Sequence, residues 1–505
     1  MELKIKKMGE YIYNKKDILL IYTLIAVLLF GTRWTGRNVS IDTVIFANEP
    51  KTFYNWLDIG RQGLVLTKIL FSPFGYNPYW EGFLTCLAMI IMAVLLLYYL
   101  EEVMKASISK LSCVIMLGII ESGVVFSLQY FFFMQIFEIY FSIILTLGSL
   151  ICIYQWILKK NIYSCIAGIL LMVWAFSSYQ ATVPLYILFG IVGYMFYDED
   201  KISEHVILIL KLIITFLIAF LINMIVTKLF FNSSDYLDMM YAWKNGTALE
   251  NIKSHMVAVW TGKNGVIYNH HYKIIVIAYI IWAFLNLKKV KLLKVLASIM
   301  IILAPFYLTF YTGMYSVQRA QFNLVFCVAF CYMLLINKFG DLKIMRNILV
   351  ILSIVNILNQ SYTTLKLFYT DDVRYQSDVQ YAYQISECLK SEGVEENTLP
   401  VVFIGRLSAG TNNDCLEYDQ NYSEYFGASI WGMNADEAPS YFWSTQLGTL
   451  FMKAIGIKYD NANEQQVEEG RKVAREMSCW PRDNSIKVVD GEYVVVKLSE
   501  DEFEN

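Results

Sequence analysis

Charged residues are scarce in this chain. Asp, Glu, Lys and Arg make up 17% of its 505 residues, whereas hydrophobic residues make up 57%. A soluble domain carries about 25% charge, so the composition argues against a wholly soluble protein. From Asp371 onward there are 25 acidic and 11 basic residues, which leaves 30 basic and 19 acidic residues before it. This asymmetry predicts a membrane-embedded part, residues 1–370, and a water-facing acidic domain, residues 371–505.

The chain also lacks the motifs of common soluble enzymes and of metal sites. We find no P-loop, no GxGxxG and no GxSxG. The nine cysteines form no CxxC and no Cys/His cluster, so no zinc site is expected. No cofactor is predicted, and the sequence leaves open whether the protein requires a divalent metal. One disulfide among Cys388, Cys415 and Cys479 is possible, but the sequence does not select a pair.

Long apolar runs predict about eleven transmembrane helices. A bilayer core needs about 20 apolar residues per helix, and backbone exposed to lipid must be helical. The run Ile18–Phe30 precedes bulky Arg33-Trp34 instead of a small-residue cleavage site, so we expect it to be retained as a membrane helix. The expected spans are 17–34, 81–100, 111–130, 133–157, 163–178, 181–197, 204–230, 272–287, 292–311, 320–337 and 345–367.

The distribution of Lys and Arg predicts the orientation. Basic residues lie in the N-terminal tail and in alternate loops such as Lys159-Lys160 and Lys288-Lys289, whereas the connections 131–132 and 179–180 carry none. Cytoplasmic loops are the basic ones. The N-terminus is therefore expected in the cytoplasm of a bacterium and, with eleven spans, the C-terminal domain outside the cytoplasmic membrane.

Two outer loops are long, residues 35–80 and 231–271. Within the first, Phe53–Phe71 predicts an amphipathic helix that lies on the membrane surface.

The acidic C-terminal part is predicted to be a small α/β domain. Asp378–Leu389 predicts a helix, and Pro400–Ile404 predicts a buried strand. Ile486–Leu498 predicts a hairpin around Asp490-Gly491. The fold class is thus a polytopic α-helical membrane protein with a C-terminal extracytoplasmic α/β domain.

Asp42 follows the first span at the outer boundary. A carboxylate there can act as a general base that takes the proton of an acceptor hydroxyl. The alternative is a helix-capping aspartate at the membrane surface. Glu49 is a second candidate on the same loop.

Three basic residues are expected near the same boundary. Arg61 and Lys68 are seven residues apart on the predicted surface helix and so on one face, and Arg319 opens the tenth span. Such residues can hold a lipid phosphate, with Arg favoured for its forked donors. The alternative is snorkelling toward lipid headgroups.

Polar residues inside apolar spans predict a pocket. Glu121 and Glu138 lie within spans, where charges usually face a cavity or a partner. Further polarity at the outer helix ends comes from Gln129, Gln135 and Gln180. Two interpretations agree with these polar residues: a hydrophilic pocket, or a network of hydrogen bonds between helices. His270-His271 could bind the acceptor or could simply be solvated at the surface.

Several of these segments resemble the bacterial and phage membrane glucosyltransferases of the GtrII type. Ile41-Asp42-Thr43 and the run Phe53–Leu64 (FYNWLDIGRQGL) carry the resemblance, supported by Ser178-Tyr179-Gln180-Ala181 and Gln318-Arg319. The resemblance covers roughly residues 15–370. The first-loop motif is fairly specific, whereas Tyr-Gln and Gln-Arg alone are weak.

The resemblance implies an inverting GT-C-type hexosyltransferase that uses a polyprenyl-phosphate sugar, glucose by the family label. In this interpretation Asp42 is the base, and Arg61, Arg319 and Lys68 bind the donor phosphate. A second carboxylate often follows the first in such enzymes, but here Thr43 stands beside Asp42. The substrate pocket would be lined by Glu49, Glu121, Glu138, Tyr179, Gln180 and His271.

The expected partners are the lipid bilayer, the donor lipid and a surface glycan acceptor oriented by the acidic domain. That domain's negative charge disfavours anionic partners, and no nucleic acid is expected. Three other classes stay open: a lipid-linked oligosaccharide flippase or transporter, a surface-polysaccharide polymerase or ligase, and a membrane scaffold. We see no two related halves, which transporters often have.

Overall fold

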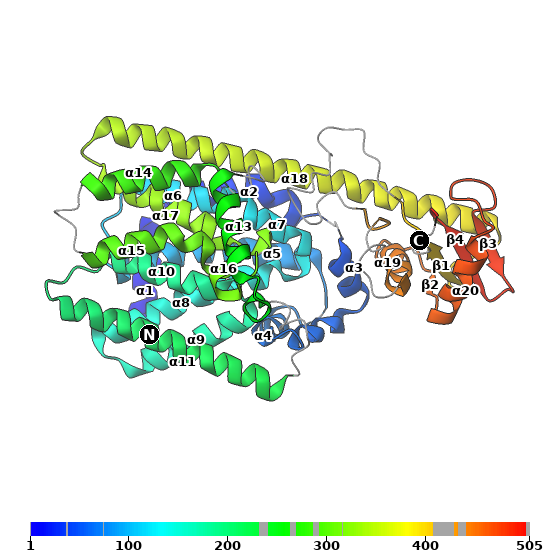
Figure 1. Cartoon of the computed structure of the whole chain (residues 1–505), viewed down its shortest axis with the longest axis horizontal. Helices are drawn as coiled ribbons and strands as arrows, with labels where there is room; N and C mark the ends of the chain where they lie inside the picture. Colours follow the sequence, from blue (N-terminus) through cyan, green and yellow to red (C-terminus); the bar gives the residue numbers. More distant parts are fainter. Residues whose placement is uncertain are drawn as a thin grey trace.

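The computed structural model describes residues 2–36, 39–73, 75–231, 241–262, 269–285, 292–315, 317–407, 429–432 and 441–500. The molecule is elongated, with a helical bundle at one end and a small domain containing a sheet at the other (Figure 1). Within the described residues, six helices are long and apolar enough to cross a membrane, and five shorter apolar helices accompany them. These features indicate a multi-pass membrane protein.

Each of the eleven apolar segments predicted from the sequence falls on a helix or on a broken pair of helices. The helices of the bundle are α1 (Glu2–Asn14), α2 (Lys16–Trp34), α5 (Pro78–Tyr98), α6 (Lys110–Ser122), α7 (Val124–Gln129), α8 (Ile136–Lys159), α9 (Ile162–Ser178), α10 (Thr182–Phe196), α11 (Ile202–Phe230), α13 (Ala248–Thr261), α14 (His271–Leu285), α15 (Leu292–Leu303), α16 (Tyr307–Thr312) and α17 (Phe322–Lys338). Shorter turns of helix are η2 (Tyr99–Val103), η3 (Tyr130–Gln135), η4 (Ala242–Asn245), η6 (Ala304–Phe306) and η7 (Gln318–Ala320).

The core of the bundle is apolar and aromatic. Helix α17 is buried from Phe322 to Ile336, as expected for a segment that is hydrophobic all round. Phe126 stacks on Tyr140 with ring centroids 5.2 Å apart, and Phe189 packs edge-on against Phe326 at 4.9 Å. These contacts bring α7, α8, α10 and α17 together around one core.

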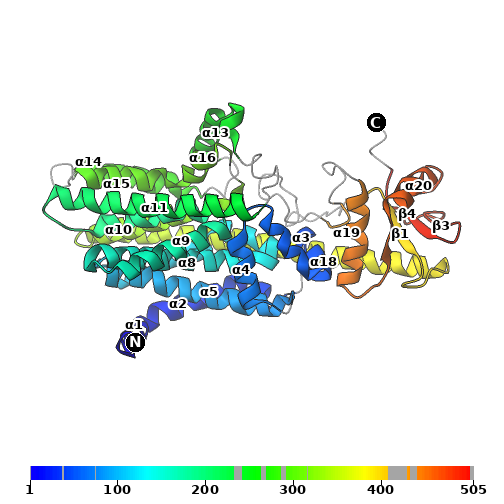
Figure 2. The same ribbon diagram turned by 90° about the horizontal axis from the view of Figure 1, so that it is seen from below.

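The first outer loop folds into three short elements at the end of the bundle that faces the C-terminal domain (Figure 2). They are α3 (Ile41–Asn48), η1 (Pro50–Leu57) and α4 (Gln62–Phe71). The single surface helix predicted over 53–71 is therefore wrong, because the chain turns between η1 and α4 at Gly60, whose φ is 72°. Helix α4 buries Leu64 and Val65 against the bundle and leaves Leu66, Ile69 and Leu70 exposed.

The second outer loop, 231–271, contains η4 and α13 in its described part. Residues 232–240 and 263–268 lie outside the described residues.

The C-terminal domain has a four-stranded mixed sheet with strand order β2-β1-β4-β3. Strand β1 (Pro400–Ile404) is parallel to β2 (Asp460–Asn461) and β4 (Tyr493–Lys497), and β3 (Ile486–Val489) is antiparallel to β4. The predicted buried strand and hairpin are confirmed. Helices α19 (Tyr441–Ala454) and α20 (Glu464–Ala474) pack on this sheet. Cys388 and Cys479 are free thiols, and Cys415 lies outside the described residues.

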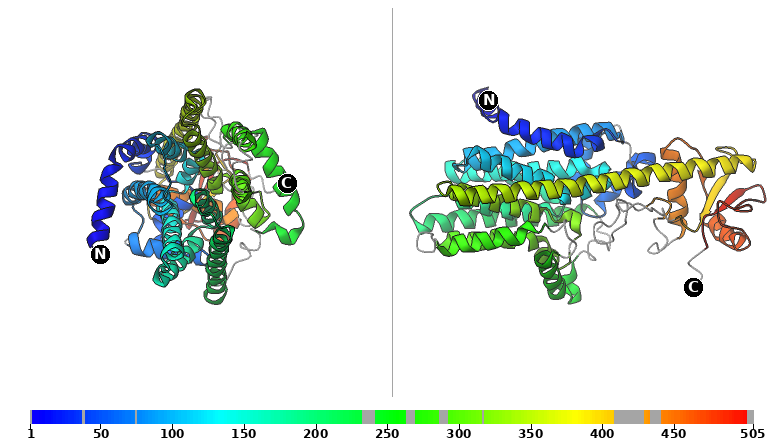
Figure 3. Two further views of the ribbon diagram at one scale, coloured as in Figure 1. Left: turned by 90° about the vertical axis from the view of Figure 1, so that its left-hand side faces the viewer. Right: turned by 90° about the horizontal axis from the view of Figure 1, so that it is seen from above.

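One helix joins the two parts of the molecule. Helix α18 (Lys343–Ser391) is continuous over 49 residues, a length of about 73 Å at the usual rise, and it runs along the whole molecule (Figure 3, right). The last predicted span and the helix predicted over 378–389 are both parts of it. The predicted boundary between residues 370 and 371 therefore lies inside a helix that carries no Gly or Pro at that point.

The close approach of α4 to α9 depends on Gly63. A Cβ at this position would lie 2.5 Å from the Trp174 carbonyl oxygen, which is fixed backbone of α9. We expect Gly63→Ala to lower the stability of the folded protein by about 1–3 kcal/mol through overpacking. A lower melting temperature in detergent would measure this loss. Gly9→Ala is the matched control, since a Cβ at Gly9 has no neighbour within 4 Å, and an equal effect of the two changes would contradict the expectation.

Candidate active site

Asp42 lies in the first turn of α3. Ser40 occupies the helix N-cap position, so Asp42 is not the capping residue of the alternative interpretation. Its side chain is exposed, and among the described residues none donates a hydrogen bond to its carboxylate. The first turn of a helix favours a negative charge, because backbone N–H groups point toward it. Asp42 is therefore an accessible carboxylate held on a fixed backbone.

The surroundings of Asp42 combine exposure with enclosure. Burial by the surrounding elements raises the pKa of the Asp42 carboxyl, and the charges of Arg319 and Arg61 act to lower it. Asp42, Arg61 and Arg319 come from segments far apart in the sequence, and the contacts of Ser40, Arg61 and Arg319 with residues 131–135 bring these segments together.

Arg61 immediately precedes α4 and points toward the end of the bundle. Its Nη1 donates to Gln135 Oε1 at 3.4 Å. Its guanidinium carbon lies 5.3 Å from the centre of the Tyr179 ring, which follows α9. Both partners are neutral, so the positive charge of Arg61 is oriented without being neutralised.

Arg319 lies in η7, just before α17, with its guanidinium 4.6 Å from the centre of the Phe132 ring. Gln129 joins this segment to α9, because its Nε2 donates to the Arg319 carbonyl at 2.6 Å and to the Tyr179 hydroxyl at 3.1 Å. Arg61, Arg319 and Tyr179 are thus held in one arrangement, in which Arg61 and Arg319 form the basic pair of the site.

The irregular turn η3 supports every part of this arrangement. Phe132 leaves helical geometry at φ −103° and ψ 57°. The Phe131 carbonyl accepts a hydrogen bond from Ser40, two residues before Asp42, and Thr43 Oγ1 lies 3.5 Å from the Met134 sulfur. With Phe132 against Arg319 and Gln135 against Arg61, η3 contacts the segments that carry the base candidate and both members of the basic pair.

Lys68 occupies a different place from the one expected. Its ammonium lies 2.8 Å from Glu81 Oε1, 2.8 Å from Glu138 Oε1 and 2.7 Å from the Met134 carbonyl. All three side chains of this Lys68 triad (Lys68, Glu81, Glu138) are buried. Lys68 therefore donates to Glu81 and to the Met134 carbonyl and pairs with Glu138, and its buried ammonium is not exposed to solvent where a phosphate would bind. Lys68 instead holds η3, and Glu138 is its partner and not a pocket wall.

The remaining predicted pocket residues are dispersed. Glu49 is exposed at the C-cap of α3, two helical turns from Asp42, and Gln180 is half-buried beside Tyr179. Glu121 is buried among Tyr22, Tyr130 and Tyr140.

His271 lies away from the basic pair. Its Nδ1 is 2.8 Å from the Tyr332 hydroxyl. Tyr332 lies ten residues along α17 from Phe322, about 15 Å deeper, whereas the Phe322 ring contacts the Tyr179 ring at 6.0 Å. The structure therefore does not bring His271 to the candidate site.

Some contributors were not found from the sequence. Glu81 begins a long apolar run and gives no signal that it pairs with Lys68, and Phe132 is one of many aromatic residues. In the described ranges, no three His, Cys, Asp or Glu side chains gather as metal ligands would.

The fold is that of a multi-pass helical membrane protein, with an accessible carboxylate and a basic pair near one end of its helical bundle. Comparison with protein families identifies the particular one: residues 34–336 match the family Glucosyl transferase GtrII. The chain belongs to this family, which makes it an enzyme of glucosyl transfer. Neither a curated protein nor a solved structure matches the chain.

The Lys68 triad predicts how Lys68→Met behaves. Removal of the ammonium leaves two carboxyl groups buried without their cation, which typically costs about 3–5 kcal/mol. We expect a strongly lowered melting temperature and low recovery in detergent, both improved in the triple variant Lys68→Met, Glu81→Gln, Glu138→Gln.

Lys110→Met, at an exposed lysine, is the control and should melt like the wild type. If Lys68 served only to bind a donor phosphate, Lys68→Met would keep the wild-type melting temperature and raise only the KM for the donor. That outcome would refute the assignment of Lys68 to the support of η3.

Proposed function

We propose that the protein transfers glucose from a polyprenyl-phosphate donor to a surface glycan at the outer face of the bacterial cytoplasmic membrane. Asp42 is the general base, and the basic pair binds the donor phosphate. One observation carries the proposal: the segments of Asp42, Arg61 and Arg319 are far apart in the chain, and all three contact η3, through Ser40, Arg61 and Arg319. The charges of both arginines also act on the Asp42 carboxyl. Membership of the GtrII family supports the sugar and the reaction class.

The proposed reaction is a single displacement at the anomeric carbon. Asp42 takes the proton of the acceptor hydroxyl as its oxygen bonds to the anomeric carbon, and the bond from that carbon to the phosphate oxygen breaks. Polyprenyl phosphate leaves with the bonding electron pair, and its growing negative charge is stabilised by Arg61 and Arg319. Attack opposite the leaving group inverts the anomeric configuration.

An apolar cavity supports a lipid donor. It has a volume of about 500 Å³, lies between α10, α11 and α15, and is lined by side chains such as Tyr186, Phe216 and Met300. Tyr186 is seven residues beyond Tyr179 in the chain, so the cavity extends from the level just below the basic pair toward the other end of the bundle. A prenyl chain attached to a phosphate at Arg61 would run in this direction.

The orientation follows from the loops. The lysines of the N-terminal tail and of alternate loops along the sequence support an orientation with the N-terminal end of the bundle in the cytoplasm. The candidate site and the C-terminal domain then face outward, where a surface glycan is found. The C-terminal domain stands over this end of the bundle (Figure 2) and is proposed to orient the acceptor.

The first test is a turnover assay of Asp42→Asn. The protein in nanodiscs is given polyprenyl-phosphate glucose and a cell-envelope acceptor, and the released polyprenyl phosphate is measured. The amide cannot take a proton, so we expect the rate to fall by about 10²–10⁴-fold, the usual contribution of a general base. Glu49→Gln, on the same helix but exposed at its other end, should keep the wild-type rate. Turnover by Asp42→Asn within twofold of the wild type would exclude Asp42 as the base.

The pH dependence gives a second test. The active form of Asp42 is the carboxylate, so kcat/KM should rise with pH through its pKa, which burial sets above the ordinary value of 3.8. Arg319 lowers this pKa, and Arg319→Gln should therefore move the acid limb of the profile to higher pH. Arg319→Lys keeps the charge and should leave the limb in place, while the loss of the forked donors weakens donor binding. An acid limb that is the same in all three proteins would contradict the role of Asp42.

A further inference from the structure

Helix α3 packs into the core of the C-terminal domain, although it precedes that domain by more than 300 residues in the chain. Val39 and Val44 belong to the same buried apolar cluster as Ile385, Leu450 and Phe451. Asn48 Nδ2 donates to the Leu450 carbonyl in α19 at 2.8 Å. The segment that carries Asp42 is therefore covered by residues of α18 and α19.

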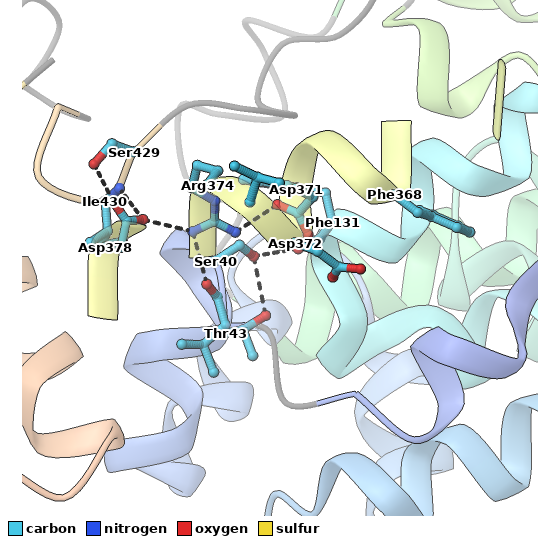
Figure 4. Close-up of polar contacts among 12 residues, drawn as sticks. Ser40, Thr43, Phe131, Phe368, Asp371, Asp372, Arg374, Asp378, Ser429 and Ile430 are labelled. Carbon is cyan, nitrogen blue, oxygen red and sulfur yellow. Dashed lines mark hydrogen bonds and ion pairs between the residues drawn. The ribbon is translucent and has the colours of Figure 1, made fainter. Parts of the chain in front are cut away.

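The backbone just before α3 is held by a buried chain of alternating charges, the junction network of Arg33, Asp371, Arg374 and Asp378. Figure 4 shows Asp371, Arg374 and Asp378 of this network. Arg374 lies at its centre. Its Nη2 is 2.6 Å from Asp371 Oδ1, and its Nη1 is 3.0 Å from Asp378 Oδ2 and 3.3 Å from the Val39 carbonyl. One guanidinium thus joins α18 to the backbone three residues before Asp42.

Both ends of the junction network are fixed. At the end of α2, Arg33 Nη1 lies 2.7 Å from Asp371 Oδ2, and its Nη2 donates to the Phe368 carbonyl at 2.6 Å. At the other end, Asp378 accepts from the Ile430 N–H at 3.0 Å and from the Ser429 hydroxyl. The network therefore connects the bundle, the backbone before Asp42 and the C-terminal domain without a break.

The basic pair is held differently. Arg61 contacts Gln135 and Tyr179, and Arg319 contacts Phe132, all of them in the bundle. The base and the phosphate-binding residues are thus supported by two packing units, which meet where Ser40 donates to the Phe131 carbonyl.

We propose that the C-terminal domain is a positioning element of the catalytic centre, with Arg374 as the positioning residue that fixes the backbone of Asp42. This inference rests on the proposed role of Asp42. It gives the domain a part in the chemical step that is separate from acceptor binding. It also assigns a role in that step to residues beyond 336, where the family match ends.

The test compares Arg374→Lys, Asn48→Ala and the control Glu396→Gln, whose carboxylate belongs to an exposed pair with Lys390 in the same domain. Lysine keeps the charge but cannot reach both aspartates and the Val39 carbonyl together. Three quantities are measured on the full-length protein in nanodiscs: kcat, the KM for polyprenyl-phosphate glucose, and hydrogen exchange of the peptides that cover 39–48 and 322–338.

We expect Arg374→Lys and Asn48→Ala to lower kcat by about 10- to 100-fold, since a displacement of about 1 Å can cost that much, with the donor KM within twofold of the wild type. Exchange should accelerate in 39–48 and stay unchanged in 322–338. Glu396→Gln should match the wild type throughout. Asn48→Ala removes no charge, so it still gives a result if Arg374→Lys does not fold.

Two outcomes would overturn the inference. The first is a wild-type kcat and wild-type hydrogen exchange in both variants. The second is a loss of donor binding together with faster exchange of 322–338, which would indicate general unfolding. The exchange measurement does not depend on the reaction. If Asp42→Asn kept full activity, the proposed function would fail, and the exchange of 39–48 would still show whether the C-terminal domain holds α3.

Discussion

The contact between the buried Lys68 ammonium and the Met134 carbonyl is the interaction on which the arrangement of the candidate site depends. Turn η3 leaves helical geometry at Phe132. Its backbone carbonyls therefore lack the hydrogen-bond donors that a regular helix supplies. A buried polar group without a hydrogen-bond partner lowers the stability of the fold. Lys68 supplies one partner and Ser40 another. Glu81 and Glu138 balance the charge that this requires. A buried ion group of this kind adds little net stability, but here it fixes an irregular turn to which the reacting segments attach.

The C-terminal domain is less independent than its acidic composition suggests. Its helix α18 continues into the bundle, and its apolar core includes Val44 from the first outer loop. Asp371, Arg374 and Asp378 are charged, but on one helix they pair at spacings of three and four residues. Together with Arg33, these pairs let the helix cross from the bundle to the domain with its charges satisfied. The shift in composition at residue 371 therefore does not mark a boundary between two folding units.

The sequence predicted the elements whose pattern is local. The apolar segments, strand β1 and the hairpin of β3 and β4 follow from runs of residues and turn signals, and the structure has them. The candidate positions of Asp42, Arg61 and Arg319 were also found, because isolated charges at helix ends are visible in a sequence. The direction of Lys68 was not, since a seven-residue spacing implies a shared face only if both residues are helical. Arg61 is the non-helical N-cap residue of α4, whereas Lys68 lies inside that helix. The junction network was missed because Arg33 and Asp371 are 338 residues apart.

Asp42, the proposed base, and the basic pair are held in different ways. A direct ion pair between Asp42 and an arginine would lower the pKa of the carboxyl and occupy the guanidinium that the phosphate needs. Here the Tyr179 ring faces Arg61 and the Phe132 ring faces Arg319, and an aromatic face orients a guanidinium without cancelling its charge. Asp42 is held through its backbone by α3, and its carboxylate stays accessible. Arg61 is thus oriented by the neutral partners Gln135 and Tyr179, and Asp42 is oriented by its backbone.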